Sequence, residues 1–141
     1  MPRRRANATW NGTLKEGKGR METESGAYDG AFSFATRFGD EPGTNPEELI
    51  AAAHSGCFSM AFANALDENG HDPEEVHTEA TVHLEDGAIT RIDLDSEAEV
   101  PGIGDDEFQA IAAEAKESCP VSMALSGGSV EEITLDATLS S

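Results

Sequence analysis

The chain has 141 residues, which is the length of one ordinary domain. Its 28 acidic residues outnumber its 9 basic residues and give a formal net charge of −19 at pH 7. This charge argues against nucleic acid as a partner, because affinity for phosphates comes mainly from lysine and arginine contacts. An acidic, lysine-poor surface is typical of proteins from a very salty cytoplasm, where salt screens the self-repulsion, so we expect a halophilic host.

No secretory or membrane segment is predicted. The first ten residues, MPRRRANATW, lack the apolar stretch of a signal peptide. The segment from Leu49 to Leu66 carries no formal charge, but it contains His54 and Asn64 and many alanines. We therefore expect a buried helix of a cytoplasmic protein that does not contact a membrane. No glycine-rich phosphate loop is present, and no cofactor is expected.

The first part of the chain predicts three strands and a long helix. Alternating apolar residues and glycine-containing turns indicate strands at 7–15, 20–26 and 31–38. The helix is predicted from Pro46 to about Asn69, because Thr44 or Asn45 can cap it and Glu47 lies in its positively polarised first turn.

The second part predicts a hairpin, two helices and a closing strand. The strands are residues 75–85, 88–100 and 130–139, with a turn at Asp86-Gly87. A helix capped by Asp105 should run to about Ser118, break at Cys119-Pro120 and restart as a short helix. The order βββ-α-ββ-α-α-β predicts a single α+β domain over residues 1–141, with a largely antiparallel sheet and two main helices.

The two cysteines are either inert core residues or a redox pair. Cys57 lies among small residues within the uncharged helix, and Cys119 lies at a helix break, where strain and exposure are expected. Structural disulfides are uncommon in a reducing cytosol, and a buried cysteine alone is more often an inert hydrophobic residue. Composition does not decide between these interpretations.

Other residues also allow two interpretations. Arg37 is one of two arginines after the first twenty residues, and an ordinary surface ion pair explains it as well as a functional role does. Helix capping alone explains Glu47. His54, Cys57 and Cys119 together would form a non-catalytic metal- or ligand-binding set. The paired Cys or His spacing of structural zinc sites is absent, so no metal is expected.

Two separate segments resemble one family. GTNPEELIAAAHSGCFSMA (43–61) and AKESCPVSMAL (115–125), with ATRF (35–38) upstream, resemble the OsmC/Ohr family of osmotically inducible and organic hydroperoxide resistance proteins. The spacing is most similar to the OsmC branch, and the resemblance extends from the Trp10-Asn11-Gly12 strand to the last strand, ITLDATL.

The resemblance implies an activity and a role for four residues. Cys57 corresponds to the peroxidatic cysteine and Cys119 to the cysteine that resolves its sulfenic acid into a disulfide, while Arg37 and the glutamate that holds it, Glu47, complete the catalytic set. The implied protein is an intertwined homodimer with active sites at the subunit interface. It would reduce organic hydroperoxides in oxidative or osmotic stress defence and be recycled by a dithiol reductant, of lipoyl type.

Rate estimates limit what Arg37 can contribute by acidifying the thiol. An ordinary thiol is only about 3% thiolate at pH 7, and lowering its pKa to ~6 would raise this population roughly 30-fold. The less basic thiolate would, however, react about 13-fold more slowly, so the net gain in rate is only about two- to threefold. We therefore expect Arg37 mainly to fix the peroxide and to stabilise charge on the departing oxygen. The apolar residues Phe34, Phe38, Phe58, Met60 and Phe62 are expected to form a pocket that favours organic hydroperoxides over hydrogen peroxide.

Overall fold

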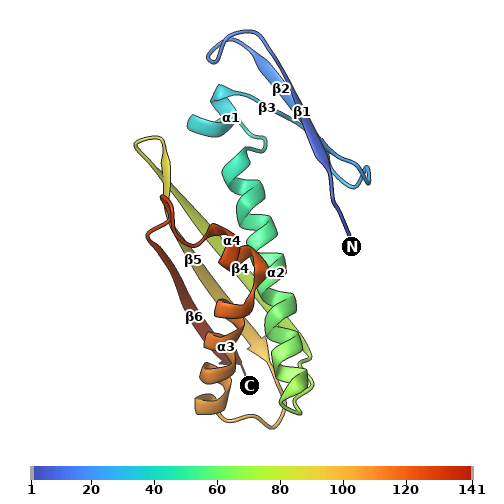
Figure 1. Ribbon diagram of the computed structural model, residues 1–141, viewed down its shortest axis with the longest axis vertical. Coiled ribbons are helices and arrows are strands. Elements are labelled where there is room, and N and C mark those ends of the chain that lie inside the picture. Colours follow the sequence, from blue (N-terminus) through green and yellow to red (C-terminus); the bar gives the residue numbers. More distant parts are fainter. Residues whose placement is uncertain (1, 141) are drawn as a thin grey trace. The chain divides into compact units, whose positions relative to one another are not determined.

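The computed structural model describes residues 2–140, and these fall into two compact units, one up to Leu49 and the other from Ile50 onward. Helix α2 (Pro46–Glu68) belongs to both, because it begins in the first unit and continues through the second (Figure 1). Each unit is described by itself below. The single domain over residues 1–141 stays a prediction.

The first unit is a three-stranded antiparallel sheet followed by a short helix. Its strands, in the order β1-β2-β3, are β1 (Ala6–Asn11), β2 (Lys18–Thr23) and β3 (Asp29–Phe32). Gly19 of β2 pairs with Trp10 on one side and Phe32 on the other. A Cβ at this position would lie 2.5 Å from the Trp10 ring and 2.6 Å from the Phe32 ring, so glycine lets the two aromatic rings pack 5.3 Å apart.

The predicted third strand at 31–38 is wrong beyond its first two residues. The strand ends at Phe32, and Phe34–Phe38 forms helix α1. A capping box explains the change, because the Ser33 side chain accepts a hydrogen bond from the Thr36 N–H while the Thr36 hydroxyl accepts one from the Ser33 N–H. Arg37 therefore lies in the last turn of a short helix and not at a strand end.

Helix α2 starts as the sequence predicts. The Asn45 side-chain oxygen accepts a hydrogen bond from the Glu48 N–H at 2.8 Å, and Pro46 is the first helical residue. Within the described residues, α2 is the one helix long and apolar enough to cross a membrane, judged by length and composition only. The core helix of a soluble protein passes the same test, and α2 supplies Phe58, Phe62 and Leu66 to the core.

The second unit packs helices on one face of a three-stranded sheet (Figure 1). Strands β4 (Glu75–Glu85) and β5 (Ala88–Glu99) form an antiparallel hairpin, whose turn residues Asp86 and Gly87 have φ of 51° and 80°. Such paired positive φ values are typical of a type I′ turn. Strand β6 (Glu132–Ser140) pairs in parallel with β5, so the sheet is antiparallel in one pairing and parallel in the other.

Two helices make the crossover from β5 to β6 that parallel pairing requires. Helix α3 (Asp105–Ser118) and helix α4 (Pro120–Leu125) are separated at Cys119, as predicted. Gly104, and not the predicted Asp105, is the N-cap of α3, and Asp105 takes the first helical position. The α+β class is confirmed, with a short helix α1 added to the predicted order.

The core of the second unit joins all of its layers. Phe62 of α2 contacts Phe58 and Phe108 with ring centroids 5.5 and 5.2 Å apart, and Ile92 and Leu94 of β5 complete the cluster. All five are at most 1% exposed, and burying each contributes about 1.5–3 kcal/mol. Because the cluster includes Cys119 and packs against Cys57, it holds in place the two backbone segments that carry the sulfurs.

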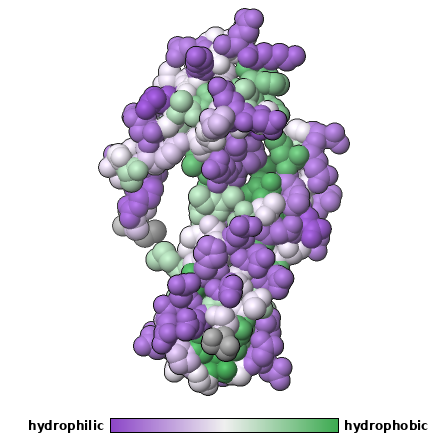
Figure 2. Space-filling model, turned by 180° about the vertical axis from the view of Figure 1, so that it is seen from behind, coloured by the Kyte–Doolittle hydropathy of each residue, from purple (hydrophilic) through white to green (hydrophobic). Residues whose placement is uncertain are grey.

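Charged residues occupy the opposite face of this sheet. Asp93 of β5 accepts hydrogen bonds from Thr134, Arg91 and His83, and these lower the pKa of its carboxyl well below the usual range. His83, which the strand pattern places toward solvent, is half-buried by this contact. The molecular face drawn in Figure 2 is mostly hydrophilic, as the net charge requires.

Candidate active site

The second unit brings the two cysteines together. The sulfur of Cys57, on α2, lies 3.0 Å from the sulfur of Cys119, at the junction of α3 and α4, and the two share a hydrogen bond. Both cysteines are reduced. Cys57 is half-buried and Cys119 is fully buried, so the expected exposure of Cys119 is wrong. Pro120 explains the junction, because it cannot continue α3 but suits the first position of α4.

The two thiols differ in acidity. Burial, and then the hydrogen bond with Cys119, raise the pKa of Cys57. Burial would also raise the pKa of Cys119, but hydrogen bonds from Cys57, from Ser122 and from the Val121 backbone together lower it. Of the two thiols, that of Cys119 therefore ionises at the lower pH.

The first unit brings Arg37 and Glu47 together. The Arg37 Nε donates to Glu47 Oε1 at 3.0 Å, and Nη2 donates to Oε2 at 2.8 Å. The Glu47 side chain is 11% exposed and the Arg37 side chain 36%. The hydrogen bond to Glu47 raises the pKa of Arg37. A two-pronged contact with a buried carboxylate fixes the plane of the guanidinium, which an ordinary surface ion pair does not do.

An apolar pocket of about 450 Å³ lies beside Arg37 in the first unit. It is lined chiefly by the side chains of Trp10, Leu14, Phe32, Phe34 and Phe38, and the Arg37 guanidinium lies 5.1 Å from the centre of the Phe38 ring. The predicted apolar set is partly wrong. Phe34 and Phe38 line this pocket, but Phe58 and Phe62 are fully buried in the core of the second unit, and Met60 is 77% exposed on α2.

His54 does not form the alternative metal set predicted with Cys57 and Cys119. Across residues 2–140, no group of three or more His, Cys, Asp or Glu side chains is arranged to hold a metal ion. His54 Nε2 is instead 2.7 Å from the Ser122 hydroxyl. Burial lowers the pKa of His54, so the imidazole is neutral at pH 7.

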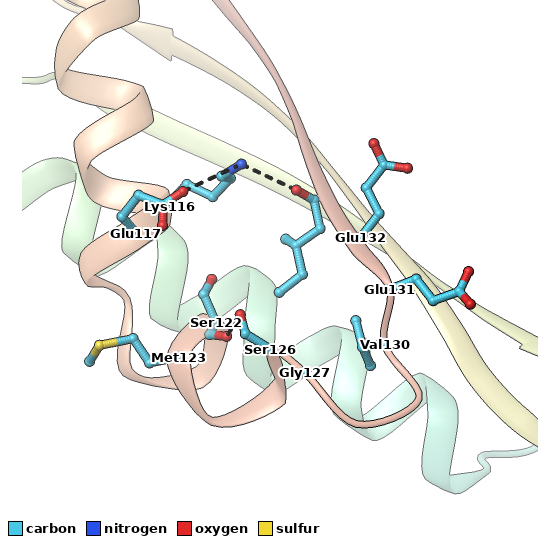
Figure 3. A pocket seen from close by; sticks show the side chains of 10 residues that line it. Lys116, Glu117, Ser122, Met123, Ser126, Gly127, Val130, Glu131 and Glu132 are labelled. Atoms are coloured by element: carbon cyan, nitrogen blue, oxygen red, sulfur yellow. Dashed lines mark hydrogen bonds and ion pairs between the residues drawn. The ribbon is translucent and has the colours of Figure 1, made fainter.

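A second pocket, of about 520 Å³, lies between α4 and the chain that leads into β6 (Figure 3). Ser122 of α4 and Ser126, the C-cap of this helix, lie on one wall, and Glu131 and Glu132 lie on the other. Lys116 of α3 spans the upper end, where its Nζ donates to the Ile133 carbonyl at 3.2 Å and lies 3.6 Å from Glu117. This pocket is acidic, because three glutamates line it and the one lysine in its lining, Lys116, is already paired with Glu117.

Comparison with known proteins shows the family to which the chain belongs. Residues 39–134 match the family model described as OsmC-like protein. The chain belongs to the OsmC family. This match spans both cysteines and Glu47, and it confirms the resemblance found in the sequence.

Individual relatives extend the OsmC similarity to nearly the whole chain. Peroxiredoxin OsmC of Escherichia coli K12 is 47% identical, over 98% of this chain and 97% of its own length. The organic hydroperoxide resistance protein of Xanthomonas axonopodis pv. citri is 32% identical over 84% of this chain and 86% of its own. An OsmC-like protein of unknown function from Vibrio cholerae shares the fold with a TM-score of 0.77 at 17% identity, over 97% and 99% of the two chains.

Sequence reasoning did not identify Ser122 as part of the site. The serine belongs to the CPVS segment, but its partner His54 is distant in the sequence, and no local pattern predicts their contact. The four predicted site residues form two pairs, Cys57 with Cys119 and Arg37 with Glu47. The two pairs belong to different units.

The sulfur–sulfur distance predicts rapid cross-linking within one chain. A disulfide needs a separation of about 2.05 Å, so the sulfurs have only about 1 Å to close. Diamide treatment of the reduced protein should therefore lower the intact mass by about 2 Da without forming covalent dimers. Cys119→Ser is the control and should not show this loss. Failure of the wild-type chain to cross-link would contradict the observed proximity.

Proposed function

We propose that this OsmC-family peroxidase reduces organic hydroperoxides by a two-cysteine cycle, with Cys57 as the attacking sulfur and Cys119 as the resolving one. The 3.0 Å approach of two reduced sulfurs from distant elements is the observation that carries the proposal. An inert core cysteine needs no such partner. The names of the relatives, peroxiredoxin and organic hydroperoxide resistance protein, support the same reaction class.

The proposed cycle has three steps. The Cys57 thiolate attacks the terminal peroxide oxygen, the O–O bond breaks, and the alkoxide leaves and takes up a proton to become the alcohol. Cys57 is then a sulfenic acid, which Cys119 converts to the Cys57–Cys119 disulfide with loss of water. A dithiol reopens the disulfide by exchange and is itself oxidised. Peroxide and dithiol are the only consumed reactants, so the cycle needs no cofactor.

The Arg37–Glu47 pair is proposed to bind the peroxide and to stabilise the departing oxygen. A guanidinium fixed by two hydrogen bonds to a buried carboxylate is a preorganised donor, and one such donor is worth about 10²–10³ in rate. Since burial and the Cys119 hydrogen bond raise the pKa of Cys57, the proposed reaction also needs a cation that stabilises its thiolate. We assign this role to Arg37 as well.

The substrate class follows from the pocket beside Arg37. Its walls are largely aromatic and aliphatic, and such a surface gains free energy when it covers an alkyl or aryl group but gains nothing from hydrogen peroxide. We therefore propose that this pocket holds the organic part of the hydroperoxide while Arg37 holds the peroxide oxygen. Equal catalytic efficiency for cumene hydroperoxide and hydrogen peroxide would contradict this assignment.

The reductant is proposed to be an uncharged dithiol of lipoyl type. Wherever salt does not screen it, the net charge of −19 favours a neutral dithiol over an anionic thiol. A dithiol also closes on itself after the first exchange and so releases the enzyme in one encounter. The proposed location is the cytoplasm, where such a dithiol would keep the cysteine pair reduced.

A homodimer is proposed because one face of α2 is apolar and uncovered. Ala52, Ala53, Gly56 and Met60 are exposed along this face, and a Cβ added to Gly56 would meet nothing within 4 Å. Only 28% of the apolar window of α2 is buried in one copy, although a helix without a charged face belongs in an interior. A second copy of this chain would cover the face and place small residues against it.

The dimer is tested by a charge placed on this face. Met60→Glu should weaken self-association at least tenfold in sedimentation equilibrium, because the 77% exposed methionine would become buried in the dimer as a carboxylate. Ala113→Glu, at an exposed position of α3, adds the same charge, and the measured mass of this variant should remain that of a dimer. A wild-type protein that stays monomeric at micromolar concentration would refute the dimer.

The catalytic role of Arg37 is tested by steady-state kinetics with cumene hydroperoxide and dihydrolipoamide. Arg37→Ala should lower kcat/KM by about 10²–10³, whereas acidification of the thiol alone accounts for only about two- to threefold. Glu47→Gln should cause a smaller loss, since the guanidinium remains but is less firmly held. Arg91→Ala is the control at the other late arginine and should retain activity. A loss below fivefold for Arg37→Ala would overturn the proposed role.

A further inference from the structure

The two sulfurs of the cysteine pair are unequally accessible to a reductant. Cys57 is half-buried, whereas Cys119 is 0% exposed and belongs to the core of the second unit. Closing the disulfide moves the sulfurs together by only about 1 Å, so we expect this difference in burial to persist in the oxidised pair. Thiol–disulfide exchange needs direct contact between the attacking thiolate and one sulfur of the disulfide, so access to each sulfur decides which one is attacked.

The surface of α2 next to Cys57 has room for a second molecule. Gly56, the preceding residue, is exposed, and a Cβ added to it would meet no atom within 4 Å in the described part of the chain. Met60, one helical turn after Cys57, is 77% exposed. The proposed cycle needs an opening to Cys57 in any assembly of the chain, because the peroxide must reach this same sulfur.

The pocket between α4 and the start of β6 does not expose the other sulfur (Figure 3). Among residues 2–140, those that line it include Lys116 and Ser122, which precede and follow Cys119 in the sequence, but not Cys119 itself. The pocket therefore gives a reductant no path to the Cys119 sulfur.

Charge favours the same sulfur as burial does. A thiolate that entered the pocket between α4 and β6 would be repelled by the three glutamates that line it, because the one lysine there is already paired. Around Cys57, by contrast, the helix carries no formal charge from Leu49 to Leu66. An anionic nucleophile therefore meets less repulsion at Cys57.

We propose that the reductant attacks the sulfur of Cys57 and not that of Cys119, so that the mixed disulfide forms on Cys57 and Cys119 is the leaving group. One thiolate of the dithiol bonds to the Cys57 sulfur, the Cys57–Cys119 bond breaks, and its electron pair leaves with Cys119, which takes a proton from solvent. The second thiol then attacks the first sulfur of the dithiol, closes the ring and releases Cys57. The dithiol is oxidised by two electrons, and both cysteines return to thiols. This inference rests on the proposed two-cysteine cycle.

The assignment gives Cys57 both external reactions of the cycle. The peroxide and the dithiol approach the same sulfur in turn, and Cys119 reacts only with Cys57. A resolving cysteine that is fully buried is then compatible with turnover, because it never has to meet a reactant from solvent.

The test starts from the disulfide made with diamide, so it needs no peroxide. The oxidised protein is mixed with 2-mercaptoethanol, a neutral monothiol that cannot close on itself, and acid stops the reaction at several early times. Acid protonates the released thiol and so prevents transfer of the adduct between the cysteines. The protein is then unfolded, free thiols are blocked with N-ethylmaleimide, and peptide masses locate the adduct. Extrapolated to zero time, the adduct should lie on Cys57 at least about tenfold more often than on Cys119.

A second measurement tests the acidic pocket as the entrance. Glu117→Gln and Glu131→Gln together remove two of its three carboxylates at exposed positions. If the reductant reaches the pair beside Cys57, this double variant should be reduced by dihydrolipoamide within about twofold of the wild-type rate, because its path does not cross the pocket. A rate more than about fivefold above that of the wild type would show entry through the pocket and overturn the inference.

The two possible failures are distinguishable. An adduct found mainly on Cys119, or spread evenly over both cysteines, overturns the inference and leaves the peroxidase cycle in place. A protein that does not consume hydroperoxide refutes the proposed function, while the position of the adduct in the diamide-oxidised protein still decides which sulfur is attacked.

Discussion

The hydrogen bond between the sulfurs of Cys57 and Cys119 is the contact on which the rest of the site depends. It joins a helix in the middle of the chain to a helix junction near its end, across 3.0 Å. The aromatic cluster of Phe58, Phe62 and Phe108 holds both elements in place, so the sulfurs meet because the core is well packed. Formation of a disulfide then needs only a small movement of the two sulfurs.

The acidities of the two thiols are opposite to those that their proposed roles suggest. The attacking sulfur must be a thiolate, yet burial and its partner raise the pKa of Cys57. Of the two thiols, that of Cys119 therefore ionises at the lower pH. In the proposed cycle Arg37 acts mainly on the departing oxygen, because acidification of the thiol alone gains little rate.

The sequence predicted most elements because their signals are local. The start of α2 follows from Asn45 and Pro46, the hairpin turn from Asp86-Gly87, and the helix break from Pro120. Helix α1 was missed because alternating apolar residues at 31–38 also fit a strand, and the capping box of Ser33 and Thr36 decided otherwise. Such competition between a short helix and a strand is settled by a few hydrogen bonds.

The site was predictable to a smaller extent, and for a physical reason. The four catalytic candidates followed from the resemblance to the OsmC/Ohr family. A family resemblance implies contacts between residues far apart in the chain, which their spacing in the sequence does not predict. The two pairings, Cys57 with Cys119 and Arg37 with Glu47, are now supported by distances. The burial of Cys119 and the bond between His54 and Ser122 depend on long-range packing. The acidic surface was evident from composition, but it lies apart from these contacts and informs the choice of reductant, not the chemistry.

The most direct test of the two-sulfur cycle is a stoichiometric titration of the fully reduced protein with cumene hydroperoxide, without reductant. We expect one equivalent to yield one equivalent of 2-phenylpropan-2-ol per chain and to remove both free thiols together, as counted with a thiol reagent. A chain that consumes the peroxide but keeps one reactive thiol, or one that leaves the peroxide intact, would contradict the account.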